Sequence, residues 1–209
     1  LCAQAVAARS YALHRREAGP ERAWHLGDTS RHQVYLGYIA PERNSAKAVA
    51  ATAGRVLLWE GEILPCWYHS TCGGGTTAAA RIFPGAAACP PLAGVACTTC
   101  SWAKRHYRWR AGPFPARRIL GLFGLPAEAR ILSLGPGEPP PRPAWWRRAR
   151  LVTTAGEAVI PAARLRRELG LKSTRIIALA RGDRGWTVRG GGWGHGVGLC
   201  QNGACGLAN

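Results

Sequence analysis

Apolar and polar residues follow a helical period in several segments of the chain. In residues 1–16 apolar positions recur at helical spacing among alanines, which predicts a buried helix. We expect further helices over 46–53, 117–123 and 161–169, with Gly54 and Gly170 as left-handed stops after the first and last of these. A final helix is expected within 197–208.

A period of two residues predicts strands elsewhere. Residues 55–59 alternate up to Glu60-Gly61, a two-residue turn, and 62–68 return as the partner strand. A second hairpin is predicted over 175–189 with its turn at 182–185, and 151–160 is expected to be extended. Aromatic and basic side chains alternate in 101–110. This pattern fits either a strand with one buried face or a surface on which sugar rings or nucleobases stack.

Helices combined with short antiparallel strands predict an α+β fold. For a chain of 209 residues we expect a single domain spanning 1–209, in which helices pack on small antiparallel sheets with glycine-rich loops. The stretch 112–150 is rich in proline and glycine and gives only weak patterns, so we predict a possible loose insert there.

The charge of the chain narrows the classes of partner. Lysine and arginine total 28 against 11 acidic residues, a net charge of +17, which favours polyanions or anionic cell surfaces. A composition rich in arginine and alanine with few lysines is also typical of a biased genome. No helix-turn-helix or zinc-finger signature accompanies the charge, so nucleic acid is not the favoured partner.

Two close pairs of metal-ligating residues are separated by a loop of 24 residues, from Gly73 to Ala96. The pairs are His69 with Cys72, and Cys97 with Cys100. Such spacing favours tetrahedral zinc in a closed Cys₃His site, which would contribute folding energy and staple the glycine-rich loop. The alternative is two disulfides or buried free thiols, with His69 an ordinary loop histidine.

The glycine-rich segment 190–198 contains His195, which is flanked by glycines and is not part of any amphipathic pattern of apolar residues. We interpret His195 either as a proton carrier or substrate contact that titrates near neutrality, or as a structural hydrogen bonder of the turn. Cys200 and Cys205 follow it. They can form a local disulfide, join His195 around a second metal or be small buried residues, and we favour the last.

Five segments in order resemble the SpoIID/LytB family, which includes stage II sporulation protein D and the amidase enhancer. They are Leu1–Ala12, Gln33–Gly37, Ala48–Gly54, Tyr68–Gly74 and Gly192–Gln201. The resemblance implies an extracytoplasmic, cell-envelope protein. Sporulation protein D looks like a lytic transglycosylase that cuts peptide-free peptidoglycan strands to 1,6-anhydro ends during engulfment, whereas LytB-type members modify an amidase.

The resemblance also implies site residues. Gln4 and Arg9 belong to the helix that carries the family's general acid, and His195 to the glycine loop opposite. Other positions that match substrate-facing segments are Ser70, Thr71, Gly73 and Gly74, together with Glu42, for which a structural salt bridge is the alternative. The general acid is a glutamate two positions before the leucine that matches Leu1, so it lies outside this sequence.

The sequence starts without methionine, inside a helical pattern, and contains no signal peptide or apolar span of membrane length. We therefore expect an N-terminally truncated fragment, inactive by itself, whose targeting segment and possible membrane tether are missing. The favoured function is a lytic transglycosylase with structural zinc, acting on peptidoglycan glycan strands. The alternative is a non-catalytic module that stimulates an amidase, and a third reading is a basic nucleic-acid-binding zinc domain.

Overall fold

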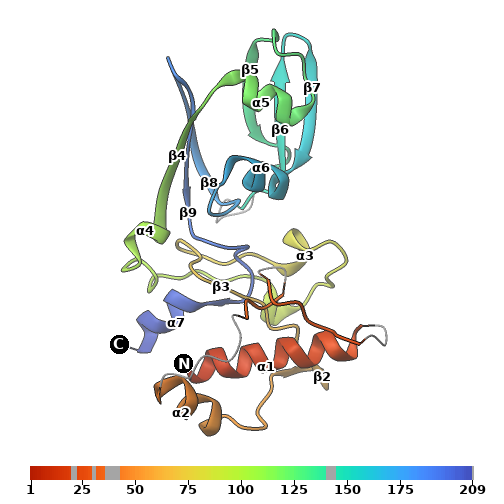
Figure 1. Cartoon of the computed structure of the whole chain (residues 1–209), viewed down its shortest axis with the longest axis vertical. Coiled ribbons are helices and arrows are strands. Elements are labelled where there is room, and N and C mark those ends of the chain that lie inside the picture. Colours follow the sequence, from red (N-terminus) through yellow and green to blue (C-terminus); the bar gives the residue numbers. More distant parts are fainter. Residues whose placement is uncertain (20–22, 30–31, 36–42, 140–144, 209) are drawn as a thin grey trace. The chain divides into compact units, whose positions relative to one another are not determined.

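A computed structural model describes residues 1–19, 23–29, 32–35, 43–139 and 145–208. Short helices and small antiparallel sheets alternate along the chain (Figure 1), which confirms the predicted α+β class. The chain divides into two compact units, Leu1–Tyr68 and His69–Asn209, called unit 1 and unit 2 below. The two units are described separately.

Unit 1 contains the predicted N-terminal helix, α1 (Cys2–Glu17), followed by α2 (Arg43–Ala51). The first predicted hairpin is confirmed but is shorter than expected, with β1 (Leu58–Trp59) paired to β2 (Glu62–Ile63). Its turn residues Glu60 and Gly61 have φ of 52° and 85°, the positive values that a tight two-residue hairpin turn requires.

Side chains of α1 hold unit 1 together through backbone groups. Arg9 donates to the carbonyl oxygens of Thr52 at 2.6 Å and Arg55 at 2.8 Å. Ser10 is fully buried, and its hydroxyl accepts a hydrogen bond from the Leu57 amide at 2.9 Å. These bonds attach α1 to the end of α2 and to the start of the hairpin.

Unit 2 contains two three-stranded antiparallel sheets. One has the order β4 (Arg108–Phe114), β9 (Gly185–Gly191), β8 (Ile176–Gly182), and the other has the order β5 (Ile131–Pro136), β6 (Arg148–Thr153), β7 (Gly156–Pro161). The hairpin of β8 and β9 was expected from the sequence and is confirmed. Gly190 lies opposite Trp109 in the register of β4 and β9. A Cβ atom at position 190 would overlap the tryptophan ring, so this position requires glycine.

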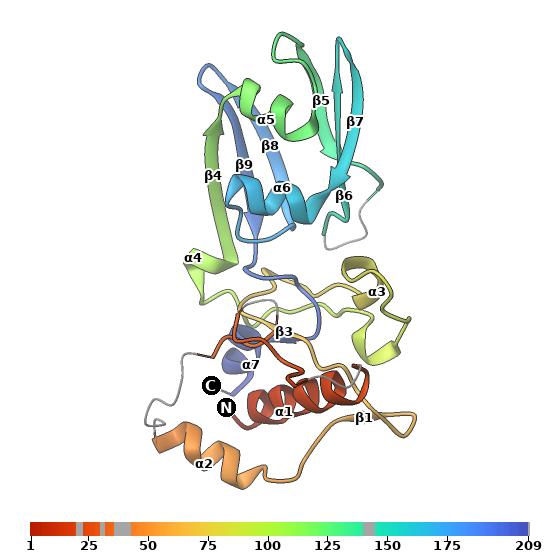
Figure 2. The same ribbon diagram turned by 45° about the vertical axis from the view of Figure 1, so that its right-hand side comes forward.

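Helices α5 (Ala116–Phe123) and α6 (Ala162–Leu169) pack with both sheets into the main hydrophobic core of unit 2 (Figure 2). Both helices match the predicted segments, and Gly170 ends α6 with a φ of 65°. The stretch 112–150, for which we predict a possible loose insert, contains α5 and β5 and supplies several core side chains. Its core members include Ile119, Leu120, Phe123, Ile131, Leu134 and Trp146.

The remaining part of unit 2 consists of loops with short elements. These are α3 (Ala79–Ile82), the 3₁₀ helix η1 (Pro90–Leu92), α4 (Lys104–Tyr107) and α7 (Gln201–Ala208). A two-stranded pair joins β10 (Leu199–Cys200) to β3 (Tyr68–His69), the strand at which the two units meet in sequence. Among the described residues no helix combines the length and apolarity that crossing a bilayer requires.

Candidate functional site

Four cysteines of unit 2 converge in the loop region: Cys72, Cys97, Cys100 and Cys200, called the cysteine cluster below. Their sulfur atoms all lie within 4.8 Å of one another. The Sγ atoms of Cys72 and Cys100 are 3.5 Å apart, and both residues are fully buried. All eight cysteines of the chain are free thiols, so the disulfide alternative does not describe this structure.

Cys200 takes the place that we predicted for His69. Because β3 pairs with β10, the C-terminal cysteine is carried into the cluster from 100 positions beyond Cys100. The Nδ1 atom of His69 lies 3.0 Å from the carbonyl oxygen of Val197, and its Nε2 atom is buried without a hydrogen-bond partner. His69 therefore lies beside the cluster, outside the group of four sulfur atoms.

Hydrogen bonds around Cys200 favour a thiolate at that position. The backbone amides of Cys72 and Gly203 both donate to its Sγ atom at 3.2 Å. A side-chain hydrogen bond from Cys72 lowers the pKa of Cys200. The same bond raises the pKa of Cys72, and burial raises it further, while nearby His69 lowers it. Burial, with Cys72 next to it, raises the pKa of Cys100 to about 11.

The cluster has the dimensions of a tetrathiolate metal site. A tetrahedral zinc ion with Zn–S bonds of about 2.3 Å places its sulfur ligands about 3.8 Å apart, within the range seen here. Gly203 leaves room for the sulfur atoms, because a Cβ atom there would lie 3.0 Å from Sγ of Cys97 and 3.1 Å from that of Cys200. Burial disfavours four thiolates side by side, so the thiols lose their protons readily only when a bound cation takes the place of those protons.

The other cysteine of the C-terminal pair behaves differently. Cys205 is exposed, whereas Cys200 is buried in the cluster. The preferred interpretation as small buried residues is therefore confirmed for the burial of Cys200 and is wrong for Cys205. The two residues differ because Cys200 lies on β10 and Cys205 on α7.

An open groove of about 560 Å³ borders the same loops in unit 2, and we call it the tryptophan groove. Its lining residues are Ser70, Trp102, Ala103, Lys104, Arg105, His106, Gln201 and Asn202. The Trp102 ring is 54% exposed, and its Nε1 atom donates to the carbonyl oxygen of Asn202 at 3.0 Å. An anchored but open indole beside amide and hydroxyl groups suits a sugar ring, which presents C–H faces and hydroxyls.

A second exposed tryptophan adjoins this groove. The ring of Trp193 lies 4.4 Å from that of His106, measured between centroids, and 5.4 Å from Nζ of Lys172. Partial burial and the positive charges of Lys172 and Arg105 lower the pKa of His106. A lowered pKa favours the neutral imidazole, which can both donate and accept hydrogen bonds.

The segment 101–110 contains one buried and one exposed tryptophan, and a stacking role for the exposed one stays a prediction. Trp109 is buried in the core of unit 2 and donates from Nε1 to the carbonyl oxygen of Gly192 at 2.8 Å. Trp102 instead faces solvent. The aromatic-basic alternation thus belongs to two elements, α4 and the strand β4.

The predicted substrate-binding residues of the Tyr68–Gly74 segment fall in different environments. Ser70 lines the tryptophan groove. Thr71 is fully buried, and its hydroxyl accepts a hydrogen bond from Nδ2 of Asn202 at 2.7 Å. The carbonyl oxygen of Gly73 accepts hydrogen bonds from Arg108 at 2.7 Å and from Arg175. Gly74 lines a different cavity, described below. Their substrate roles stay predictions.

His195 lies near two other rings of unit 2. Its ring centroid is 5.1 Å from that of Phe83 and 5.5 Å from that of His69. The Val197 amide donates to its Nδ1 atom at 3.1 Å, which fixes the orientation of the imidazole. The residues lining the tryptophan groove do not include His195. Its role as proton carrier or substrate contact stays a prediction.

The remaining predicted site residues belong to unit 1. Gln4 lies on α1 and is partly buried. Arg9 is engaged with two backbone carbonyls, as described above. Glu42 lies outside the described residues. Sequence reasoning missed Cys200, His106, Asn202 and Trp193 as neighbours of the site, because their proximity depends on contacts between distant segments.

Comparison with known proteins gives three matches. The model of the SpoIID family, stage II sporulation protein, matches residues 1–59. An uncharacterized protein of Brachyspira hyodysenteriae is 27% identical over 209 residues, which is 100% of this chain and 55% of that protein. The amidase enhancer of Bacillus subtilis is 36% identical over 83 residues, which is 40% of this chain and 11% of that protein.

The chain thus spans about half of one relative and a small part of the other. The family match covers α1, α2 and β1, and it coincides with the first three of the segments that suggested the family from sequence. Both the SpoIID family model, over residues 1–59, and the amidase enhancer support the resemblance of this chain to the SpoIID/LytB family.

Proposed function

We propose that this chain is the glycan-binding part of an extracytoplasmic lytic transglycosylase, which cuts peptide-free peptidoglycan strands and leaves 1,6-anhydro ends. The match of residues 1–59 to the SpoIID family model and the relative named amidase enhancer support a role at the cell wall. The membrane tether stays an expectation.

The tryptophan groove is the observation that supports this proposal most. Trp102 offers an open ring held by its own hydrogen bond, and Trp193 offers a second exposed ring next to His106. Ser70, Gln201 and Asn202 add hydroxyl and amide groups at the same place. Two exposed tryptophans with hydroxyl and amide side chains match the alternating C–H faces and hydroxyl edges of a glycan strand, and Lys104 and Arg105 add positive charge to the same lining.

The proposed chemistry needs a single carboxylic acid. That acid protonates the glycosidic oxygen, and its conjugate base then takes the proton from the 6-hydroxyl of the sugar, whose oxygen attacks the anomeric carbon. The bond to the leaving sugar breaks and the 1,6-anhydro ring closes, so no water is consumed. By the family resemblance this acid is a glutamate upstream of Leu1, and His195 is the predicted proton carrier or substrate contact.

We also propose that the cysteine cluster holds structural zinc. Four cysteine ligands close the coordination shell, which is typical of a structural and not a catalytic site. Cys200 is followed directly by Gln201 and Asn202 of the tryptophan groove. The cluster therefore fixes the backbone from which two groove side chains project.

The proposal is tested by the binding of peptide-stripped glycan strands to the chain and to Trp102→Ala. We expect the variant to bind about tenfold more weakly, because base or sugar stacking on an aromatic ring contributes on the order of 1–3 kcal/mol. Trp24→Ala is the matched control, since Trp24 is 60% exposed but belongs to unit 1. Equal loss in both variants contradicts a site at the groove, and salt-sensitive binding of DNA in preference to glycan supports the nucleic-acid reading instead.

Cleavage is tested with the chain extended upstream by its natural residues. Peptide-stripped strands are incubated with the extended protein, and 1,6-anhydro ends are measured by mass spectrometry. We expect these ends from the extended protein and none when the upstream glutamate is replaced by glutamine. Reducing ends without anhydro rings would contradict the transglycosylase chemistry and indicate hydrolysis.

A second candidate function is the stimulation of an amidase, and the relative named amidase enhancer favours it. Here the groove would hold the glycan while a partner enzyme cuts the peptide side. The measurement is the rate of a cell-wall amidase with and without the chain on intact peptidoglycan. Stimulation by a protein that makes no anhydro ends would replace the transglycosylase by this function.

A further inference from the structure

A separate cavity of about 770 Å³ lies in unit 2, and we call it the arginine pocket. It is lined by Gly74, Thr76, Thr77, Ala78, Ala80, Arg81, Ala93, Gly94, Val95, Ala96 and Arg147. It shares no lining residue with the tryptophan groove. Among the described residues its lining contains two arginines and no acidic side chain, and its other side chains are small.

Two chain segments form the wall of this pocket and are held in register by hydrogen bonds. The Thr76 amide donates to the carbonyl oxygen of Val95 at 2.9 Å, and the Val95 amide donates to the Thr76 hydroxyl at 2.8 Å. A Cβ atom at Gly94 would lie 2.9 Å from the Thr76 carbonyl oxygen, so only glycine lets the segments approach this closely. The wall is therefore built before any ligand arrives.

The guanidinium group of Arg81 is held by one hydrogen bond and one long ion pair. Its Nε atom donates to the carbonyl oxygen of Trp145 at 3.3 Å. Its Nη2 atom is buried and lies 3.8 Å from Oε1 of Glu138, too far for a hydrogen bond. Arg81 therefore lines the cavity with a 21% exposed side chain whose charge is only partly balanced, and an incoming anion would compete with Glu138 for it.

The second arginine adds charge at the same cavity. Arg147 is exposed, and its backbone carbonyl accepts a hydrogen bond from the Ala162 amide at 2.9 Å, which anchors the main chain at the start of α6. The backbone of Arg147 is thus fixed, while its exposed side chain borders the cavity. Arg81, which is held in place, and Arg147, which is exposed, border a cavity of this size. Together they suit the carboxylate of a small cyclic molecule such as a sugar acid.

We propose that the arginine pocket binds the free carboxylate of an N-acylated muramic acid, the sugar acid that a glycan strand exposes once its stem peptides are removed. This inference rests on the proposed function for the source of the ligand. Removal of the peptide turns an amide into a carboxylate, so each such sugar gains one negative charge. The two arginines then distinguish stripped from peptide-bearing strands by charge, independently of stacking in the tryptophan groove.

The test uses three small ligands whose binding to the whole chain is measured by NMR titration. They are N-acetylmuramic acid, the same sugar with its carboxyl group amidated, and N-acetylglucosamine, which lacks the lactyl group. We expect the acid to bind at least about tenfold more tightly than either neutral sugar, which corresponds to about 1.4 kcal/mol, close to the lower end of the range of roughly 1.5–3 kcal/mol for one charged hydrogen bond. Equal binding of the acid and its amide would overturn the proposal.

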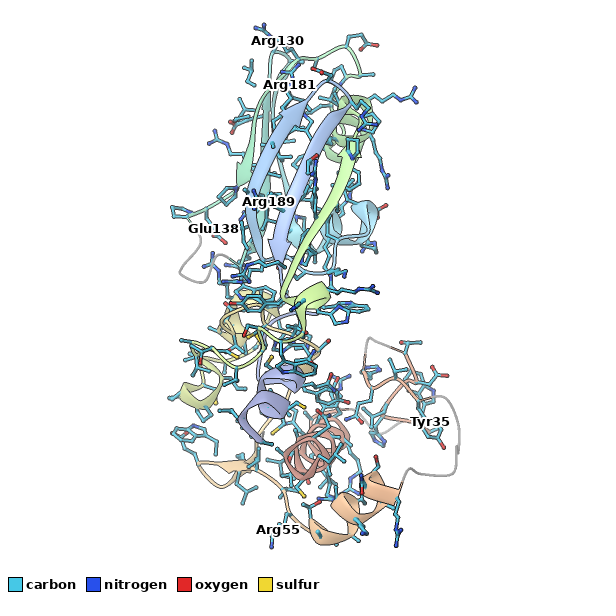
Figure 3. The ribbon with its side chains drawn as sticks, turned by 90° about the vertical axis from the view of Figure 1, so that its left-hand side faces the viewer. Tyr35, Arg55, Arg130, Glu138, Arg181 and Arg189 are labelled. Atoms are coloured by element: carbon cyan, nitrogen blue, oxygen red, sulfur yellow. The ribbon has the colours of Figure 1, made fainter. Side chains whose placement is uncertain are left out.

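Two variants and one control assign the effect to this pocket. Arg81→Gln and Arg147→Gln should each remove most of the preference for the acid. Arg130→Gln should keep it, because Arg130 is exposed and lies away from Glu138 in unit 2 (Figure 3). Arg147→Gln is decisive if Arg81→Gln unfolds through loss of its bond to Trp145. A preference unchanged in Arg147→Gln, or lost equally in Arg130→Gln, counts against the pocket.

The outcomes also separate this inference from the proposed function. Loss of the acid preference with intact strand binding and anhydro-end formation overturns the pocket alone. Binding of the acid in the pocket by a protein that neither binds nor cuts strands supports the pocket and removes the transglycosylase. Inorganic phosphate is added as a competitor, and phosphate that binds as tightly as the muramic acid shows a general anion site in place of a carboxylate site.

Discussion

Replacing Cys200 by serine should abolish stoichiometric zinc binding while leaving the fold of the metal-free chain largely unchanged. The change removes one of four sulfur atoms that lie within 4.8 Å of one another, and the two backbone amides that donate to Cys200 at 3.2 Å can still bond to a hydroxyl. A closed tetrathiolate site becomes a three-ligand site. Cys205→Ser is the matched control, because Cys205 is an exposed thiol five positions away in sequence.

The size of the effect follows from linkage between binding and folding. Zinc at a thousandfold excess over its dissociation constant stabilises the folded chain by about 4 kcal/mol. For a chain of this size, 1 kcal/mol corresponds to about 2–4 °C in melting temperature, so zinc should raise the wild-type melting temperature by roughly 8–16 °C. In Cys200→Ser most of that increase should disappear, and in Cys205→Ser it should remain.

The assay combines metal analysis with thermal unfolding, with and without a chelator. With chelator present the three proteins should melt at similar temperatures, which separates loss of metal from damage to the fold. His69→Ala is the informative fourth protein: it should keep one zinc per chain, because His69 lies outside the group of four sulfur atoms. One zinc in Cys200→Ser but none in His69→Ala would refute the cluster as described and restore the Cys₃His site.

Three further outcomes follow from contacts in unit 2. Gly190→Ala should lower the free energy of unfolding by about 1–3 kcal/mol, because the new Cβ overlaps the Trp109 ring. Gly121→Ala, in open space on α5, should instead raise the free energy of unfolding by about 0.5–1 kcal/mol; urea unfolding measures both, and equal effects would contradict the packing argument. The pKa of His106, lowered by burial and by Lys172, should rise in Lys172→Gln when followed by NMR. The pKa of His106 is lower in the folded than in the unfolded chain. The stability that neutral His106 contributes is therefore present above the unfolded pKa of about 6.5 and lost as pH falls through the folded pKa. A His106 pKa unchanged by Lys172→Gln would exclude the charge of Lys172 as a cause.

Local signals in the sequence account for the elements that were predicted correctly. The Glu60-Gly61 turn and the Gly170 stop are local choices of backbone conformation, so neighbouring residues suffice to locate them. The helices α1, α5 and α6 were also predictable from local sequence, because the helical spacing of apolar residues can be recognised within a few turns.

The parts that escaped prediction depend on distant contacts. Trp145 is fully buried, donates from Nε1 to the carbonyl oxygen of Gly75 at 3.0 Å and leaves no space for a side chain at Gly196. Nothing near Trp145 in the sequence indicates that partner, so the proline-rich stretch around it gave no readable pattern. Cys200 is a similar case, since the two-residue pairing of β3 and β10 that brings it to Cys72 is too short to leave a period.

The order Cys200-Gln201-Asn202 makes the cysteine cluster and the tryptophan groove neighbours along one backbone. Asn202 also donates to Thr71, which directly precedes Cys72, so both sides of the cluster are tied to the groove. An oxidant or a chelator that reaches the sulfur atoms would therefore loosen the tryptophan groove without contacting the groove itself. In an oxidising compartment, where thiols form disulfides, the shape of the groove would then depend on the redox state of the surroundings as well as on its ligand.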